Sequence, residues 1–177
     1  KYTSANTCAK TLVNTLENLG VESIFGYPGA AVLSIYNELS FSKIKHYLVR
    51  HEQAAVHAAE GYARVSGKPG VVLVTSGPGF TNTITGIANA YADSTPLIIL
   101  AGDVSPKENK GKVFQKVDII SMTKTCSKKN FLLSPDDDIK QLIEEAFAVA
   151  LEEKGPVVIA LPRNILESEY KATSEAV

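Results

Sequence analysis

The feature that most constrains the fold is an unbroken apolar run, Val71–Val74, bounded by Gly70 and the turn Ser76–Gly79. A β-branched run without polar alternation is typical of a strand buried on both faces, as in helix-covered parallel sheets. Similar runs recur at 21–25, 46–49, 96–101 and 157–161. Amphipathic or alanine-rich stretches flank or separate them at 4–19, 30–39, 51–65, 81–92 and 136–153. We therefore predict an α/β domain with a mainly parallel sheet and helices on both faces.

Three parts of the chain are expected to be less regular or to mark boundaries. Ser4 is predicted to cap the first helix. Residues 102–130 are lysine-rich and poorly periodic, which predicts a long loop with one helical turn. The tail after Ile165 is polar, so we predict a domain over residues 1–165 and a linker over 166–177 that leads toward a middle domain.

Composition excludes several classes of function. The 177 residues are 45% hydrophobic and 21% charged, enough for one buried core. A net charge of -1 gives no electrostatic reason for nucleic-acid binding, and no apolar run has the length of a membrane span. Two cysteines, and histidines at 46, 51 and 57, do not have the spacing of a metal site. We expect a cytoplasmic protein with no nucleic-acid or membrane partner and no metal ligands in this chain.

Unusual residues cluster where the predicted strands end. Parallel strands bring these ends to one rim, which is where ligands bind in open α/β sheets. Glu52 follows one strand and opens an alanine-rich helix. A carboxylate there is commonly a partner of the helix dipole, and the alternative is a sheltered group that handles protons. The Ser76–Gly79 turn is not a phosphate-binding Walker loop, and it fits either a bare turn or a close backbone approach to a ligand.

Four segments carry a resemblance to a known family: Tyr27–Ala31, Val49–Ala55, His57–Arg64 and Thr75–Asn82. They resemble the amino-terminal pyrimidine-binding domain of thiamine-diphosphate enzymes. Within that superfamily the chain is most similar to the catalytic subunit of acetolactate synthase (acetohydroxyacid synthase). The similarity extends to Phe114–Ile119 and Gly155–Pro162, and covers about residues 4–165.

The resemblance implies a role for particular residues. Glu52 matches the family's catalytic glutamate, which hydrogen-bonds the cofactor's aminopyrimidine and promotes removal of a cofactor proton. The other residues that match cofactor-binding positions are Tyr27, Pro28, Gly29, Thr75, Pro78 and Asn82. Phe114 and Gln115 match residues on the substrate side.

The implied activity is decarboxylation of pyruvate and its condensation with a second 2-keto acid, in branched-chain amino acid biosynthesis. Two alternatives stay open: the same domain of another thiamine-diphosphate decarboxylase, lyase or acetyltransferase, or a non-catalytic α/β binding module. Ala30 replaces a usual glycine, Asp103 and Ser105 depart from a usual Gly-Gln-Val-Pro, and Lys116 replaces a usual glutamate. These departures leave the donor and acceptor keto acids open.

The resemblance also implies partners. The family's Gly-Asp-Gly and downstream asparagines, which hold Mg²⁺ and the cofactor's diphosphate, are not matched here. We therefore expect a diphosphate-binding domain from a second subunit, in a homodimer or homotetramer, and no turnover by this chain alone. FAD in a middle domain and a regulatory subunit are further expectations carried by the resemblance.

Overall fold

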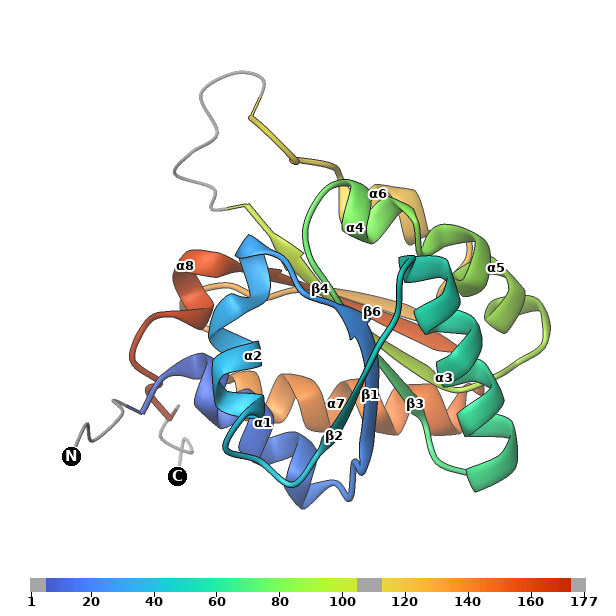
Figure 1. The fold of residues 1–177 in the computed structure, drawn as a ribbon, viewed down its shortest axis with the longest axis horizontal. Coiled ribbons are helices and arrows are strands. Elements are labelled where there is room, and N and C mark those ends of the chain that lie inside the picture. The colour runs from blue at the N-terminus through green and yellow to red at the C-terminus, as the bar shows by residue number, and fades with distance from the viewer. Residues whose placement is uncertain (1–5, 105–112, 173–177) are drawn as a thin grey trace.

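A single parallel sheet forms the centre of the computed structural model, which describes residues 6–104 and 113–172 (Figure 1). Its strand order is β2-β1-β3-β4-β6-β5, and every neighbouring pair is parallel. The predicted α/β class is confirmed. The strands are β1 (Ser23–Tyr27), β2 (Lys45–Leu48), β3 (Gly70–Val74), β4 (Leu97–Asp103), β5 (Lys129–Leu132) and β6 (Pro156–Pro162).

Helices cover both faces of this sheet (Figure 1). On β3, Val71 and Leu73 join one core cluster, and Val72 and Val74 join the other, because strand side chains alternate between faces. This is why the run is continuously apolar. The first cluster contains residues of α1 (Cys8–Asn18), α2 (Leu33–Leu39), α7 (Ile139–Glu152) and α8 (Arg163–Leu166), and the second residues of α3 (Glu52–Ser66), α5 (Ile84–Ala92) and α6 (Ile119–Thr123).

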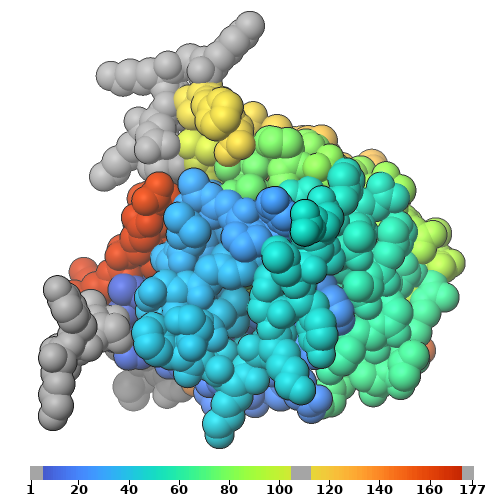
Figure 2. Space-filling model, in the orientation of Figure 1, coloured from blue at the N-terminus to red at the C-terminus, as the bar shows by residue number. Residues whose placement is uncertain are grey.

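The strand order reverses between β1 and β3. From β1 the chain passes through α2 to β2 on one side, then returns through α3 to β3 on the other side of β1. Because α2 and α3 lie on opposite faces, a crevice is expected outside the carboxyl ends of β1 and β3. The edge strand β2 lies in the blue-to-teal front surface of Figure 2, where Tyr47 and Leu48 are exposed.

Two predicted helices are broken in the structure. The stretch 30–39 opens with a 3-10 turn (Ala30–Val32) before α2. The stretch 81–92 is preceded by the short helix α4 (Pro78–Thr81), and α5 begins only at Ile84. Proline favours a first helical turn, and the Thr83 hydroxyl donates to the Phe80 carbonyl, so the backbone bends between the two helices.

The prediction of one long loop over residues 102–130 is wrong in part. The expected helical turn is α6, but β4 continues to Asp103 and the segment ends in β5. This strand is four residues long and lies at the sheet edge beside β6, with exposed Lys129 and Leu132. A short edge strand of this kind has no strong apolar pattern in sequence.

The two ends of the described chain lie together. The predicted cap Ser4 lies outside the described residues, and Thr7 caps α1 by accepting a hydrogen bond from the Lys10 amide (3.2 Å). Past residue 165 the chain stays packed as far as Tyr170, whose hydroxyl donates to Asp138 (3.0 Å). The rest of the expected linker, 173–177, is outside the described residues, and the boundary at 165 stays a prediction. Within residues 6–104 and 113–172, no helix combines the length and apolarity that crossing a membrane requires.

A glycine in β1 gives a test of the strand packing. A Cβ added at Gly26 would lie 2.0 Å from the Leu73 carbonyl oxygen on β3, so Gly26→Ala forces two paired strands apart. We expect the free energy of unfolding to fall by about 2–3 kcal/mol in chemical denaturation. Gly61→Ala is the control, because nothing lies within 4 Å of its added Cβ and alanine favours the helix by about 0.8–1 kcal/mol. A Gly26→Ala protein as stable as the unsubstituted one would contradict this packing.

Candidate functional site

Glu52 lies at the first position of α3 and is 9% exposed. The ring of His51 caps this helix, with Nδ1 accepting a hydrogen bond from the Gln53 amide (3.2 Å). The Glu52 carboxylate is instead directed across the fold, where Oε2 accepts a hydrogen bond from Asn82 Nδ2 (2.9 Å). Glu52 therefore does not cap the helix with a hydrogen bond, although its place in the first turn of α3 still suits a partner of the helix dipole.

The turns after β1 and β3 meet around Thr75. A Cβ added at Gly29 would lie 2.4 Å from Thr75 Cβ, and one added at Gly79 would lie 2.6 Å from Thr75 Cγ2. The Ala31 amide donates to the Thr75 hydroxyl (3.4 Å). Only glycine fits at 29 and 79, because Thr75 occupies the space that a side chain would take.

The Glu52 carboxylate lies beside the turn that contains Gly79. A Cβ on Gly79 would lie 3.5 Å from Glu52 Oε1. Within the described residues, Asn82 is the hydrogen-bond partner of this carboxylate, and its bond goes to Oε2. Tyr27, Pro28 and Pro78 are exposed on the turns that border the site. A carboxylate acceptor beside side-chain-free backbone suits a flat heteroaromatic ring that carries an N–H donor.

Phe114 and Gln115 lie on the next side of the same rim. Gln115 has φ of 57° and packs on Gly77, where an added Cβ would lie 2.7 Å from Gln115 Cα. Phe114 is 84% exposed. Both residues line a hollow of about 670 Å³ whose wall also includes Ala30, Ser76, Asp103 and Arg163. Glu52 is not in the described lining of this hollow, so the structure separates the two predicted groups into adjacent parts of the rim.

Two of the residues that depart from the family pattern pair with each other. Lys116 Nζ lies 3.3 Å from Asp103 Oδ2, and the two side chains are 29% and 8% exposed. The pair fixes the segment after residue 112 to the end of β4. Sequence reasoning singled out both residues without joining them, although the opposite charges were a signal. Ser105 lies outside the described residues.

A second buried carboxylate, Glu60, was not singled out from the sequence. It is 5% exposed on α3 and accepts hydrogen bonds from Asn89 on both oxygens (2.9 Å each). The signal was a charged residue eight positions after Glu52, on an otherwise small and apolar helix face.

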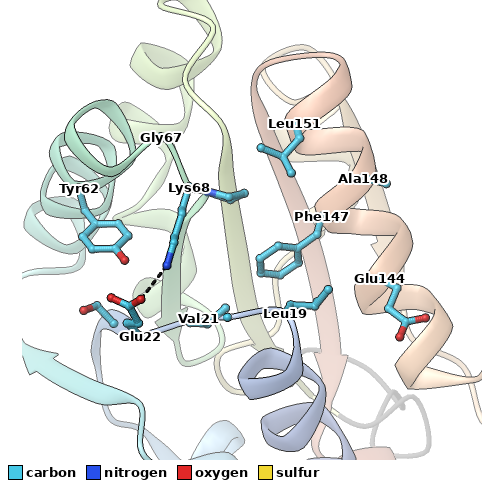
Figure 3. Close-up of a pocket in the computed structure, with 13 residues that line it drawn as sticks. Leu19, Val21, Glu22, Tyr62, Gly67, Lys68, Glu144, Phe147, Ala148 and Leu151 are labelled. Carbon is cyan, nitrogen blue, oxygen red and sulfur yellow. Dashed lines mark hydrogen bonds and ion pairs between the residues drawn. The ribbon is translucent and has the colours of Figure 1, made fainter.

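Another hollow, of about 400 Å³, lies at the opposite end of the strands, beside the amino ends of β1 and β3 (Figure 3). Its lining includes Leu19, Val21, Phe147 and Leu151, and Lys68 pairs with Glu22 across it (2.7 Å). None of the predicted site residues lines it. Among the described residues, no group of three or more His, Cys, Asp or Glu is placed to hold a metal ion.

Comparison with known proteins identifies the family of the chain. Residues 6–122 match the family described as thiamine pyrophosphate enzyme, N-terminal TPP binding domain. The chain is 48% identical over 165 residues to the acetolactate synthase isozyme 3 large subunit of Escherichia coli, covering 92% of this chain and 29% of that protein. It is 46% identical over 159 residues to the acetolactate synthase large subunit of Lactococcus lactis, covering 89% and 28%. The chain thus spans less than a third of the length of these relatives.

Gly77 gives a test of the contact between the β3 turn and Gln115. Its φ of 61° and ψ of -122° lie in a region that only glycine adopts readily, and an added Cβ would overlap Gln115. We expect Gly77→Ala to lower the free energy of unfolding by about 3 kcal/mol, since strain and overlap add. Gly67→Ala is the control, with φ of 71° and nothing within 4 Å, and should cost about 1 kcal/mol. If chemical denaturation shows that Gly77→Ala and Gly67→Ala lower the free energy of unfolding equally, Gln115 does not pack on this turn.

Proposed function

The chain belongs to the thiamine pyrophosphate (thiamine diphosphate) enzymes, as an N-terminal TPP binding domain, and from this premise we propose that it forms the pyrimidine end of the cofactor site in an acetolactate synthase. The observation that carries the proposal is the buried Glu52 carboxylate, held on one oxygen by Asn82 and directed with the other toward the Gly79 backbone.

Each residue of the crevice has a distinct task in this proposal. Glu52 Oε1 would accept a hydrogen bond from a protonated ring nitrogen of the pyrimidine and hold that proton in place. Asn82 fixes the plane of the carboxylate through Oε2. A hydrogen bond to an ionised acceptor in a sheltered site is strong and directional, so the two residues orient the ring as well as bind it. When bound, thiamine diphosphate supplies the electron sink that decarboxylation of a 2-keto acid requires.

The turns provide the walls. Gly29 and Gly79 let the two turns pack closely on Thr75, which holds them at a fixed separation beside the proposed ring site. Tyr27, Pro28 and Pro78 close the borders of the site and limit access of water to the carboxylate. Phe114 and Gln115 line the adjacent hollow, which we assign to the substrate.

The remaining parts of the enzyme are assigned to other domains. We propose that the diphosphate and Mg²⁺ are held by a diphosphate-binding domain of a second subunit, so that the active unit is at least a homodimer. FAD in a middle domain, a regulatory subunit and a cytoplasmic location complete the proposal. Its support is the match to acetolactate synthase large subunits, of which this chain covers about 29%.

Glu52→Gln tests the central role. The change keeps the shape but removes the charge, and the full enzyme should lose on the order of 10²-fold or more in kcat while it stays folded. Glu144→Gln, an exposed carboxylate on α7, is the control and should leave kcat unchanged. Near-normal turnover by Glu52→Gln would remove the proposed function.

A panel of 2-keto acids tests the reaction. We expect the full enzyme to release carbon dioxide from pyruvate and to join the remaining two-carbon unit to a second keto acid, with one acetohydroxy acid formed per carbon dioxide released. Carbon dioxide release without a carbon–carbon bond would assign a decarboxylase instead. Preference for a donor other than pyruvate would show a change of substrate. We would then attribute that change to Asp103 and Lys116, which differ from the residues expected from the resemblance.

A further inference from the structure

The contact between α3 and α5 has a regular three-level pattern, beginning at Glu52. At the first level Asn82 donates to Glu52 (2.9 Å). At the second level Val56 packs against Gly86, where an added Cβ would lie 2.6 Å from Val56 Cβ. At the third level Asn89 donates to Glu60. The levels are four residues apart on α3, so they follow one side of the helix over about 12 Å.

The third level is a fully partnered buried carboxylate. Asn89 Nδ2 lies 2.9 Å from both oxygens of Glu60, and Arg64 Nη2 donates to Oε1 (2.6 Å). The His57 ring lies on the other side, with Nδ1 3.6 Å from Oε2. Arg64 also pairs with Asp93, the residue that ends α5. Every group around Glu60 thus comes from α3 or from α5 and its end.

A buried carboxylate such as that of Glu60 adds little to the free energy of unfolding. Removing a carboxylate from water is costly, and an apolar pair of similar size commonly packs as well or better. A hydrogen bond between a carboxylate and an amide is directional. The Glu60–Asn89 contact is therefore satisfied at only one relative position of the two helices. The Val56–Gly86 contact shows that the two helices approach closely between the two polar levels, with no room for a side chain at 86.

This geometry connects Glu60 to the site. Asn82 lies two residues before α5, and Asn89 lies within it. Asn82 ends α4, and only Thr83 separates it from α5. Both residues have helical backbone angles, with φ of -64° and -86°, so a slide or rotation of α5 at Asn89 is carried across Thr83 to Asn82. The Asn82 amide is the group that holds Glu52 Oε2, so its position decides where Oε1 is directed.

We propose that Glu60 is a positioning residue for Glu52: its contact with Asn89 fixes α5 along α3 and so sets the Asn82–Glu52 hydrogen bond. The catalytic consequence rests on the proposed function, whereas the positioning itself does not.

The positioning is tested without cofactor or substrate. In the full protein labelled with ¹⁵N-asparagine, the two Asn82 side-chain amide protons should be well separated in chemical shift, since one is held by Glu52. Asn89→Ala removes the donor to Glu60 at an exposed position of α5. We expect the Asn82 resonances to converge in that variant. Asn37→Ala is the control, because Asn37 also donates to a neighbouring glutamate, Glu38, but on α2 (3.3 Å). Unchanged Asn82 resonances in Asn89→Ala would overturn the proposal.

The consequence is tested by kinetics of the full enzyme. We expect Asn89→Ala to lower kcat about tenfold, with KM and the thiamine diphosphate Kd within about twofold, because the carboxylate is misdirected and not lost. In a Glu52→Gln background Asn89→Ala should have no further effect, since coupled residues are not additive. Equal losses in both backgrounds, or an unchanged kcat in an enzyme that Glu52→Gln inactivates, would overturn the catalytic consequence of the proposal. Glu60→Gln is the second variant, should Asn89→Ala fail to fold, and should give the same pattern.

The two proposals fail in different ways. Suppose that the Asn82 resonances converge in Asn89→Ala, but that the full enzyme with Glu52→Gln is as active as the unsubstituted protein. The proposed function is then wrong and the positioning contact stands. If Glu52→Gln is inactive but Asn89→Ala changes neither the resonances nor kcat, the proposed function stands and Glu60 has no positioning role.

Discussion

Parallel pairing of β1 with β3 is the constraint on which the rest of the structure depends. The register sets Gly26 opposite Leu73 and Tyr27 opposite Val74, so the two strands end at the same level. Both turns therefore begin side by side, at the point where the strand order reverses. A shift of one residue would turn the side chains of β3 to the wrong faces and separate Thr75 from Gly29. The same register thus serves the core and the crevice.

The close approach of the two turns, and not a need for backbone flexibility, explains why glycine occupies positions 29 and 79. Gly29 and Gly79 are excluded from having a side chain by one residue, Thr75, and not by unusual backbone angles. Gly77 is different, because its own φ and ψ require glycine. Glycine is therefore required for packing reasons at two positions and for conformational reasons at a third.

The sequence predicted the parts of the fold that depend on local pattern. The apolar run at Val71–Val74 predicted a strand buried on both faces, and the strand ends predicted the rim. The edge strand β5 was missed because its four residues, Lys129–Leu132, have neither a continuous nor a clearly alternating apolar pattern. The sequence did not predict which residues contact each other, because tertiary packing alone brings the partners together. Examples are the pairs Glu52–Asn82 and Asp103–Lys116. The roles predicted for these residues stay predictions.

The two sides of the rim differ in how firmly they are built. Around Glu52 every contact comes from strand ends or helices that pack in the core, and the Val56–Gly86 and Glu60–Asn89 levels extend that packing along α3. Around the adjacent hollow, Phe114 is exposed, and its segment is held by Gln115 on Gly77 and by one half-buried ion pair. The residues that depart from the family pattern, at 30, 103 and 116, lie on this second side. Ala30 and Phe114 are exposed on this side, whereas Asp103 is buried against Lys116. A change at Gly79 or Thr75 would displace both turns. The exposed positions in the part that we assign to the substrate should therefore tolerate substitution better than the closely packed turns in the part that we assign to the cofactor.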